Sequence, residues 1–443
     1  MKQKVCLIFI MCFALAACAC GKDGEEPASL GALDGPVSLE EAGQDHAEQA
    51  DLNQSGSTGE PSGLGEQEEN SSVRLLNQQN KGSVGASSDG FYEIHYLGGS
   101  PGANILYTDA ASAQRIYLSP DLSSDHQSAS DPSWLDSEIT AGGVTVLVAN
   151  EHLFLANTGL DDTPGAIYKA ELDGSGRTKL AEFTEHYVEW FTGEIAFDGE
   201  WFYVSGESQT KLLGVSSVDG TVKELCTFPN NVGLVSGAFD DQVLITTFEE
   251  TEGVEDMSAE ERYSALKTAL YSYHVDSGQM EEIMSWKTED RIIYADGHLL
   301  YYFDIPGDCL KAADLRDGGE EIILASLTES GINGADISEI RTVLDGHLVY
   351  SDEYDHNIDL FSGRVTDMAS LSNYKPMVLW GSYGEQYLVS SGELEIPYDG
   401  YDPGGNPTVL VTSISLLSLI DKDDYWNGNY DNLVPVKNVF LED

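Results

Sequence analysis

Residues 291–327 show a hydrophobic pattern that recurs through most of the chain. Four runs rich in apolar and aromatic residues, at 291–295, 299–304, 310–315 and 321–325, are separated by polar residues. Asp-Gly occurs in two of the separating turns, and Asp-Gly between apolar runs favours a β-hairpin. The second run is continuously apolar, which indicates a strand covered on both faces, whereas the third and fourth alternate more, as expected nearer solvent. The segment therefore predicts four antiparallel strands.

The same unit repeats along the chain. One marker residue stands just before the core of each second strand, and successive markers lie 39 to 56 residues apart. The markers are His152, Trp201, Gln242, His298, His347 and Gln386. A period of roughly 40–50 residues with four strands per repeat is typical of a β-propeller. We therefore predict an all-β protein, a β-propeller of four-stranded blades, because no single blade can bury both of its own faces.

The two ends of the repeat region are expected to close the ring. Runs at 91–97, 105–108 and 115–118 predict three further strands, of which the last two look like a second and third strand. The apolar run at 409–420 lies near the C-terminus, and pairing of the two ends would remove exposed strand edges. Seven blades fit best, with six or eight as alternatives. We place the propeller at residues 89–443.

Residues 1–17 have the three regions of a secretory signal: two lysines, an apolar core of about 13 residues and a small-residue end. That core is too short to span a membrane as a helix. The end, Leu15 to Cys18, resembles the lipobox of bacterial lipoproteins. The resemblance implies cleavage before Cys18 and lipidation of the Cys18 sulfur, and two acyl chains suffice for stable anchoring. We expect a lipid anchor on the extracytoplasmic face of the cell membrane; an ordinary secretory peptide cut after Ala17 is the alternative.

The segment that follows the signal, 18–88, is expected to be a disordered acidic linker after the lipidated Cys18. Residues 19–88 contain no aromatic residue and are rich in Gly, Ser, Glu and Asp, so they cannot bury enough apolar surface to offset chain entropy. The pattern at 71–79 allows one short helix. A second polar stretch, 249–267, interrupts the third marked repeat. Its S-x-x-E capping box predicts a helix at 259–267, either as a tolerated insertion or as a partner-contacting element.

Two strand ends resemble those of YWTD repeats. Leu106 to Asp109 reads LYTD and is followed by Ile116-Tyr117, and Val349 to Asp352 reads VYSD and is followed by an apolar strand. In YWTD repeats, a Tyr-Trp-Thr-Asp strand end precedes a short turn and an Ile-Tyr strand. The chain is thus similar to bacterial surface lipoproteins with a YWTD-related β-propeller domain. Other repeats depart from the form, since Val204-Ser205-Gly206 lacks the Asp.

The formal net charge of −54 narrows the choice of partners. It argues against nucleic acid or anionic lipid as a direct partner, because both carry charge of the same sign. The acidity suits solubility in an exposed setting, and a broad, weak affinity for divalent cations is the other interpretation. Only Cys226 and Cys309 lie within the repeats. They are two repeats apart, which is too far for the ~7 Å Cα separation that a disulfide tolerates.

Catalytic and metal-binding motifs are not found in the sequence. It has no nucleophile elbow, P-loop, HExxH or dinucleotide fingerprint, so we expect no catalytic residue and no cofactor. His152, His298 and His347 share one repeat position, but equivalent positions on separate blades are dispersed, so we expect no metal site there. Residues 421–431 are rich in carboxylates but lack the spacing of a calcium loop. The Asp pairs fit turn chemistry better than catalysis; they are Asp161-Asp162, Asp240-Asp241 and Asp423-Asp424.

Two classes of function fit these observations. The first is a monomeric, membrane-anchored lipoprotein whose propeller is a non-catalytic binding or scaffold module for an envelope protein or glycan. The alternative is a propeller enzyme, or an enzyme subunit, that acts on cell-envelope glycan or peptidoglycan; fold alone does not choose. We favour the first, although the sequence does not identify the ligand-binding residues. Five aromatic residues suit either sugar stacking or, as we favour, the core between blades: Trp134, Trp380, Tyr398, Tyr401 and Trp426.

Overall fold

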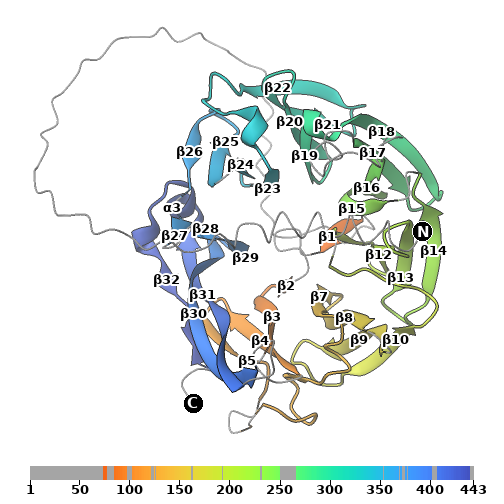
Figure 1. Cartoon of the computed structure of the whole chain (residues 1–443), viewed down its shortest axis with the longest axis vertical. Helices are drawn as coiled ribbons and strands as arrows, with labels where there is room; N and C mark the ends of the chain where they lie inside the picture. The colour runs from red at the N-terminus through yellow and green to blue at the C-terminus, as the bar shows by residue number, and fades with distance from the viewer. Residues whose placement is uncertain are drawn as a thin grey trace, which may run out of the picture. The chain divides into compact units, whose positions relative to one another are not determined.

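The computed structural model describes residues 73–439 with gaps at 77–83, 97–101, 121–123, 125, 161–162, 192, 230–231, 250–265, 353, 369, 372–374, 377 and 402–406. In this part of the chain, seven antiparallel sheets surround a central axis and form a seven-bladed β-propeller (Figure 1). The predicted all-β propeller of four-stranded blades is confirmed, and so is the preferred number of blades.

The first four blades follow the chain in order, each numbered from the axis outwards. Blade 1 contains β2 (Val84–Ala86), β3 (Gly90–Tyr96), β4 (Ala103–Asp109) and β5 (Gln114–Tyr117), with β6 (Trp134–Leu135) beside β4. Blade 2 contains β7 (Val144–Ala149), β8 (His152–Leu160), β9 (Thr163–Glu171) and β10 (Thr178–Phe183). Blade 3 contains β11 (Ile195–Phe197), β12 (Trp201–Gly206), β13 (Lys211–Ser216) and β14 (Val222–Thr227). Blade 4 contains β15 (Gly233–Phe239), β16 (Gln242–Glu249), β17 (Lys267–His274) and β18 (Gln279–Lys287).

The last three blades complete the circle. Blade 5 contains β19 (Arg291–Asp296), β20 (Leu299–Asp304), β21 (Cys309–Asp314) and β22 (Glu320–Ser326), preceded by η2 (Thr288–Asp290). Blade 6 contains β23 (Glu339–Leu344), β24 (His347–Ser351), β25 (Asp355–Asp359) and β26 (Val365–Asp367), after η3 (Gly334–Asp336). A two-stranded sheet, β27 (Ser370–Leu371) and β28 (Lys375–Pro376), precedes blade 7. Blade 7 contains β29 (Leu379–Tyr383), β30 (Gln386–Tyr401), β31 (Pro407–Asp421) and β32 (Val434–Pro435), with α3 (Lys422–Trp426) and η4 (Tyr430–Asn432) between the last two.

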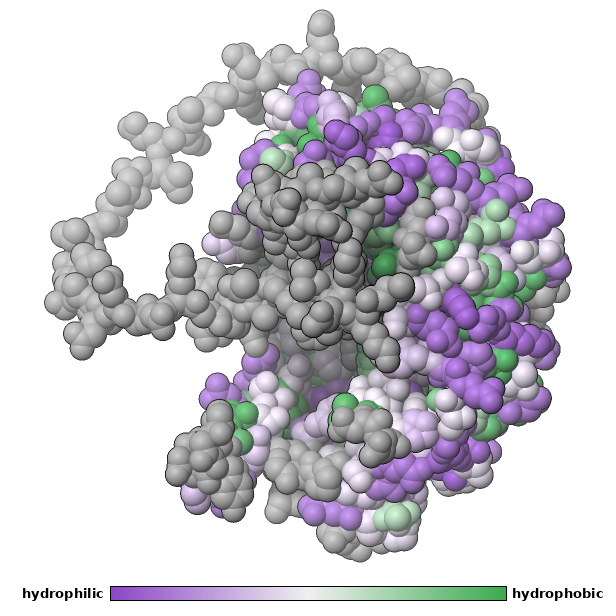
Figure 2. All heavy atoms as spheres, turned by 45° about the vertical axis from the view of Figure 1, so that its right-hand side comes forward, coloured by the Kyte–Doolittle hydropathy of each residue, from purple (hydrophilic) through white to green (hydrophobic). Residues whose placement is uncertain are grey.

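Burial follows the predicted difference between strands. The six marker residues stand at or directly before the start of β8, β12, β16, β20, β24 and β30. In blade 5, four successive residues of the second strand β20 are buried, whereas the first four residues of the outermost strand β22 are exposed. The second strands are covered on both faces because adjacent blades pack on them, as with Phe154 of blade 2 and Phe202 of blade 3, whose rings lie 5.1 Å apart. Hydrophilic side chains cover most of the described surface in Figure 2.

The fold begins before residue 89. β1 (Arg74–Leu76) and β2 lie inside the segment 18–88 that we assigned to the linker, so the expected boundary at residue 89 falls inside blade 1. The helix allowed at 71–79 is wrong, because Arg74–Leu76 is a strand. The runs at 105–108 and 115–118 form third and fourth strands, not second and third, since β2 supplies the first. Three-residue strands are too short to show an alternating pattern.

β1 lies beside the axis, on the inner edge of blade 3 (Figure 1). It pairs antiparallel with β11, and the Val73 amide donates to the Asp240 carbonyl at 2.6 Å, in the first turn of blade 4. Val73 and Leu76 are each 4% exposed. Because Asp240 belongs to the face with the short turns, β1 begins at that face and runs away from it beside β11.

The two ends of the propeller meet at blade 1. β33 (Lys437–Asn438) pairs in parallel with β5, which confirms that the C-terminus joins the N-terminal blade. Arg115 of β5 connects three segments: its guanidinium forms an ion pair with buried Glu93, donates to the Ser415 carbonyl of blade 7 at 2.7 Å, and reaches Asn438 Oδ1 at 3.4 Å. The long β30–β31 hairpin also reaches this blade, where Ile414 packs on Leu106.

Two expectations fall on residues that the structure does not describe. The predicted helix at 259–267 lies mainly in the gap 250–265, although Lys267 begins β17. Cys18 and the signal segment lie outside the described residues as well. In the part that is described, no helix is long and apolar enough to cross a membrane.

Candidate functional site

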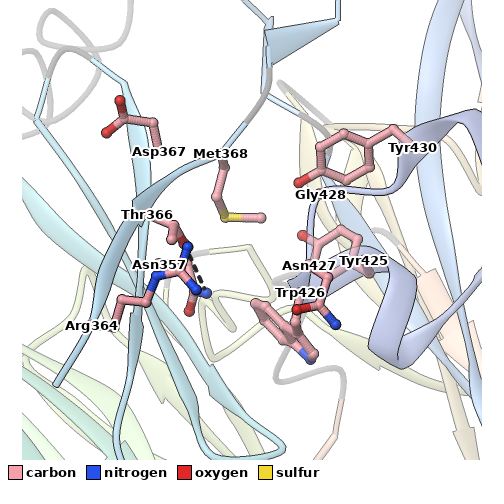
Figure 3. Close-up of a pocket in the computed structure, with 10 residues that line it drawn as sticks. All are labelled: Asn357, Arg364, Thr366, Asp367, Met368, Tyr425, Trp426, Asn427, Gly428 and Tyr430. Atoms are coloured by element: carbon pink, nitrogen blue, oxygen red, sulfur yellow. Dashed lines mark hydrogen bonds between the residues drawn. The ribbon is translucent and has the colours of Figure 1, made fainter. Parts of the chain in front are cut away.

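A cavity of about 230 Å³ lies where blade 7 departs from the other six blades. In those blades, four to six residues connect the third strand to the fourth, but 422–433 make this connection in blade 7 and contain α3 and η4. The longer connection faces the outer strands β25 and β26 of blade 6, and side chains from the two sides line the cavity between them (Figure 3). The cavity therefore has one wall from each blade.

Hydrogen bonds within blade 6 hold the first wall. Asn357 of β25 is 4% exposed, and its Nδ2 donates to Thr366 Oγ1 of β26 at 3.3 Å. Its Oδ1 lies 3.1 Å from His347 Nδ1, which therefore carries a hydrogen and donates. Burial lowers the pKa of His347, so the imidazole is held neutral at this wall. The polar atoms on this side are thus fixed before any ligand arrives.

A network of aromatic and charged residues holds the second wall. The Trp426 indole stacks on the His347 ring, with centroids 4.2 Å apart and planes 10° from parallel. Trp426 Nε1 donates to Tyr387 Oη at 3.0 Å, and Tyr387 Oη donates to Asp345, whose Oδ2 also lies 3.1 Å from Lys422 Nζ. Burial, and then the Asp345 carboxylate, raise the pKa of Tyr387. The plane of the indole is therefore set by contacts on several sides.

The turn after α3 places Tyr430 at the cavity. Gly428 has φ +74°, a left-handed conformation that suits glycine at the end of a helix. Asp424 accepts hydrogen bonds from Asn429 Nδ2 at 3.0 Å and from Asn432 Nδ2 at 2.8 Å. Both oxygens of Asp424 are thus engaged in forming the turn, which is the role that turn chemistry predicted for the Asp423-Asp424 pair.

The two charged residues of the cavity differ in their partners. Asp367 Oδ1 lies 3.0 Å from His356 Nδ1, and His356 Nε2 lies 3.0 Å from Asp352 Oδ1, so Asp367 belongs to a three-residue cluster. Arg364 is exposed, and its guanidinium makes no hydrogen bond or ion pair with the described residues. An arginine without a carboxylate partner is notable in a chain with 76 acidic and 22 basic residues.

The three marker histidines do not come together. They lie in blades 2, 5 and 6; His152 and His298 interact within their own blades, whereas His347 also contacts Trp426 of blade 7. His152 Nδ1 lies 2.6 Å from the Asn150 carbonyl, and His298 Nε2 lies 3.7 Å from Asp314 Oδ2. His347 is the one that contributes to the cavity, through its contacts with Asn357 and Trp426. Cys226 and Cys309 are both free and lie in blades 3 and 5.

The aromatic candidates separate into core and cavity residues. Trp380 packs in the cluster between blades 7 and 1, beneath the Arg115 guanidinium at 6.0 Å. Trp134 stands over Gly102, where any side chain would collide with its ring. Trp426 serves both roles, since it belongs to the core of blade 7 and lines the cavity. Tyr398 lies in β30, and nothing is described of the Tyr401 side chain.

A second polar cluster escaped the sequence reasoning because its members are far apart in the chain. Ligand atoms of His186, Glu207 and Glu224 all lie within 4.8 Å of one another at blade 3. His186 Nδ1 is 2.9 Å from Glu207 Oε1, and Lys211 Nζ is 2.7 Å from Glu224 Oε1. The Lys211 ammonium pairs with Glu224 and holds the pKa of this carboxyl low, so the cluster is an ion-pair network.

A buried His-Asp pair fixes the connection between blades 1 and 2. His126 Nδ1 lies 2.9 Å from Asp131 Oδ2, and Asp131 Oδ1 accepts from Ser133 Oγ at 2.7 Å. Burial raises the pKa of Asp131, but hydrogen bonds from Ser124 and Ser133 outweigh burial and lower the pKa to about 2. Asn104 Nδ2 joins the pair by donating to the His126 carbonyl at 2.8 Å. The arrangement anchors a loop, as the other Asp-rich turns do.

Comparison with protein-family models and with curated proteins finds no match. Among solved structures, the chain is similar to the β-propeller domain of the Trilobed protease from Pyrococcus furiosus, with 11% identity, a TM-score of 0.42, and coverage of 78% of this chain and 95% of that one. It is similar to TolB from Acinetobacter baumannii, with 14% identity, a TM-score of 0.33, and coverage of 77% and 76%. It is also similar to a chain of the nidogen/laminin complex, with 11% identity, a TM-score of 0.33, and coverage of 67% and 92%. At these values the likeness concerns the β-propeller fold alone.

Proposed function

We propose that the chain is a lipoprotein, anchored on the extracytoplasmic face of the cell membrane through Cys18, whose β-propeller is a non-catalytic binding or scaffold module. Its partner would be an envelope protein or a glycan. The lipobox resemblance at Leu15 to Cys18 supports the anchor. The propeller would act as a monomer on a linker that lets it search near the membrane.

One observation supports binding over catalysis: the chain's own β1 runs along the axis. Val73 and Leu76 of this segment are buried, and β1 contributes a fifth strand to blade 3. A central channel gives a propeller a concave place in which catalytic groups from several blades can converge. Here apolar residues of the N-terminal segment occupy the inner edge of blade 3 instead.

The arrangement of the connections supports the same proposal. β1 begins on the face where Asp240 and the other short turns lie. Longer connections, such as 118–143 and 327–338, join one blade to the next on the opposite face. Loops of this kind carry binding surfaces on many scaffolds. The insertion 250–265 lies between β16 and β17, the second and third strands of blade 4, and its structure is outside the described residues.

The test compares binding with turnover in the full-length chain. Envelope proteins and glycans would be captured on the intact protein and on a variant that lacks 250–265, and both would be incubated with glycan, muropeptide and peptide substrates. We expect a partner that is lost or weakened in the deletion variant, and no turnover. Turnover that one carboxylate substitution abolishes would overturn the proposal in favour of the enzyme alternative.

A further inference from the structure

We propose that the cavity between blades 6 and 7 binds one pyranose ring that carries a carboxylate, with the ring against Trp426 and the carboxylate on Arg364. The inference rests on the proposed binding function, since it names a ligand class for the module. Figure 3 shows Arg364 on the blade 6 side, and Trp426 below Met368 on the side of α3.

The size of the cavity limits the ligand to about one ring. Its 230 Å³ is less than the ~300–1,000 Å³ of pockets that hold drug-sized molecules. With ~30 Å³ per water molecule, it corresponds to roughly eight waters. A longer ligand would place one ring in the cavity and leave the rest outside. The site is therefore suited to a single residue, such as the end of a saccharide chain.

The aromatic wall favours a sugar ring over a small inorganic anion. His347 covers one face of the Trp426 indole, and the Tyr425 and Tyr387 rings lie edge-on to it with centroids 4.7 and 5.8 Å away. The part of the indole that lines the cavity can contact a ligand. Its plane is already fixed by Tyr387 and His347, so stacking requires little ordering of the side chain. Aromatic rings present apolar area that suits the C–H face of a pyranose, while Asn357, Thr366 and Asn427 supply polar atoms for hydroxyl groups.

The unpaired Arg364 favours a ligand with one negative charge. A guanidinium binds a carboxylate through two parallel hydrogen bonds, and this one has no described partner to give up. Phosphate is disfavoured on two grounds. Asp367 lines the same cavity. The net charge of −54 repels a dianion more strongly than a monoanion.

The experiment measures binding of matched sugars to the full-length chain by titration calorimetry and ligand-observed NMR. Each acidic sugar is compared with a neutral counterpart: glucuronic acid with glucose, and N-acetylmuramic acid with N-acetylglucosamine. The two comparisons distinguish a uronic acid carboxylate from the lactyl carboxylate of muramic acid. We expect at least one acidic sugar to bind at least tenfold more tightly than its neutral counterpart. Arg364→Gln should remove most of that difference. This variant should fold, because the Arg364 side chain makes no hydrogen bond or ion pair with the described residues.

Arg316→Gln is the matched control. Arg316 lies in the equivalent turn of blade 5, is 50% exposed, and its loss changes the net charge by the same amount. It should leave the affinities for all four sugars unchanged. Three results would overturn the inference: no sugar binds, neutral and acidic sugars bind equally, or Arg364→Gln and Arg316→Gln have the same effect. Each would leave the proposed binding of an envelope partner standing, because that binding is measured separately by capture.

Discussion

Arg115 is expected to be the residue on which closure of the ring depends most. The side chains of Arg115 and Glu93 are 3% and 7% exposed, and Arg115 also donates to the Ser415 carbonyl of blade 7. Arg115→Met keeps much of the volume but leaves Glu93 buried without its partner. Burial already raises the pKa of Glu93, and Arg115 opposes that effect, so the variant should favour a protonated Glu93.

The magnitude follows from the cost of leaving one member of a buried pair alone. Removing one partner of a buried ion pair typically costs about 3–5 kcal/mol, and losing a hydrogen bond to a charged donor costs about 1.5–3 kcal/mol. The two costs are not added, because the same guanidinium makes the ion pair and the hydrogen bond. We expect Arg115→Met to lower the free energy of unfolding by about 3–5 kcal/mol. Against a typical total of ~5–15 kcal/mol, such a loss is readily measured.

The assay is urea unfolding of the full-length chain, followed by circular dichroism. Glu93→Leu combined with Arg115→Met should recover part of the loss, because the lone buried carboxyl is gone. Full recovery is not expected, since the contacts with Ser415 and Asn438 remain broken. Hydrogen exchange should rise in β31 and β33 before it rises in blades 3 and 4. A loss below about 0.5 kcal/mol, typical of an unremarkable surface position, would refute the role of Arg115 in closure.

Three further predictions follow from other parts of the chain. Leu76→Ala should lower the free energy of unfolding by about 2–5 kcal/mol in the same urea assay, because Leu76 of β1 is only 4% exposed. A loss as small as that caused by Leu160→Ala, at an exposed leucine, would contradict the burial of Leu76 in the core. Burial, and then Arg115, lower the pKa of His95 to about 4. As the pH falls below ~6.5 the unfolded chain binds a proton at His95 before the folded chain does, so the free energy of unfolding should fall by up to about 3 kcal/mol between pH ~6.5 and pH 4. His95→Gln should lose less stability over this range, and an equal loss in the parent chain and in His95→Gln would disprove the prediction. Cys18→Ala should move the protein from the membrane to the soluble fraction on fractionation of cells, and a variant that stays with the membrane would refute lipidation at Cys18.

The repeated strands could be predicted because their pattern is local. A continuous run such as 299–304 shows that both faces of a strand are covered, and Asp-Gly turns mark where it begins, so the second strands were placed correctly in six blades. β1 and β2 were missed because each has three residues, which is fewer than an alternating pattern needs. Their strand structure comes from the blades they pair with, and not from their own composition.

The candidate site could not be predicted, because it joins distant residues. Arg364 and Trp426 lie on different blades, and neither belongs to a motif. The sequence favours the core between blades over sugar stacking for Trp426, and the fixed plane of its ring depends on His347 and Tyr387, which only the fold brings to it. The ion pair between Arg115 and Glu93 is hidden for the same reason, since buried charges carry no periodic signal.

Hydrogen exchange of the full-length chain, read by mass spectrometry, tests the central claim most directly. The proposed function depends on β1 lying along the axis as part of blade 3. The account predicts that amides of 74–76 exchange as slowly as those of β11, with which they pair. Exchange at 74–76 as fast as in an unfolded peptide of the same sequence would contradict it, because β1 would then not be part of blade 3 and the enzyme alternative would be favoured.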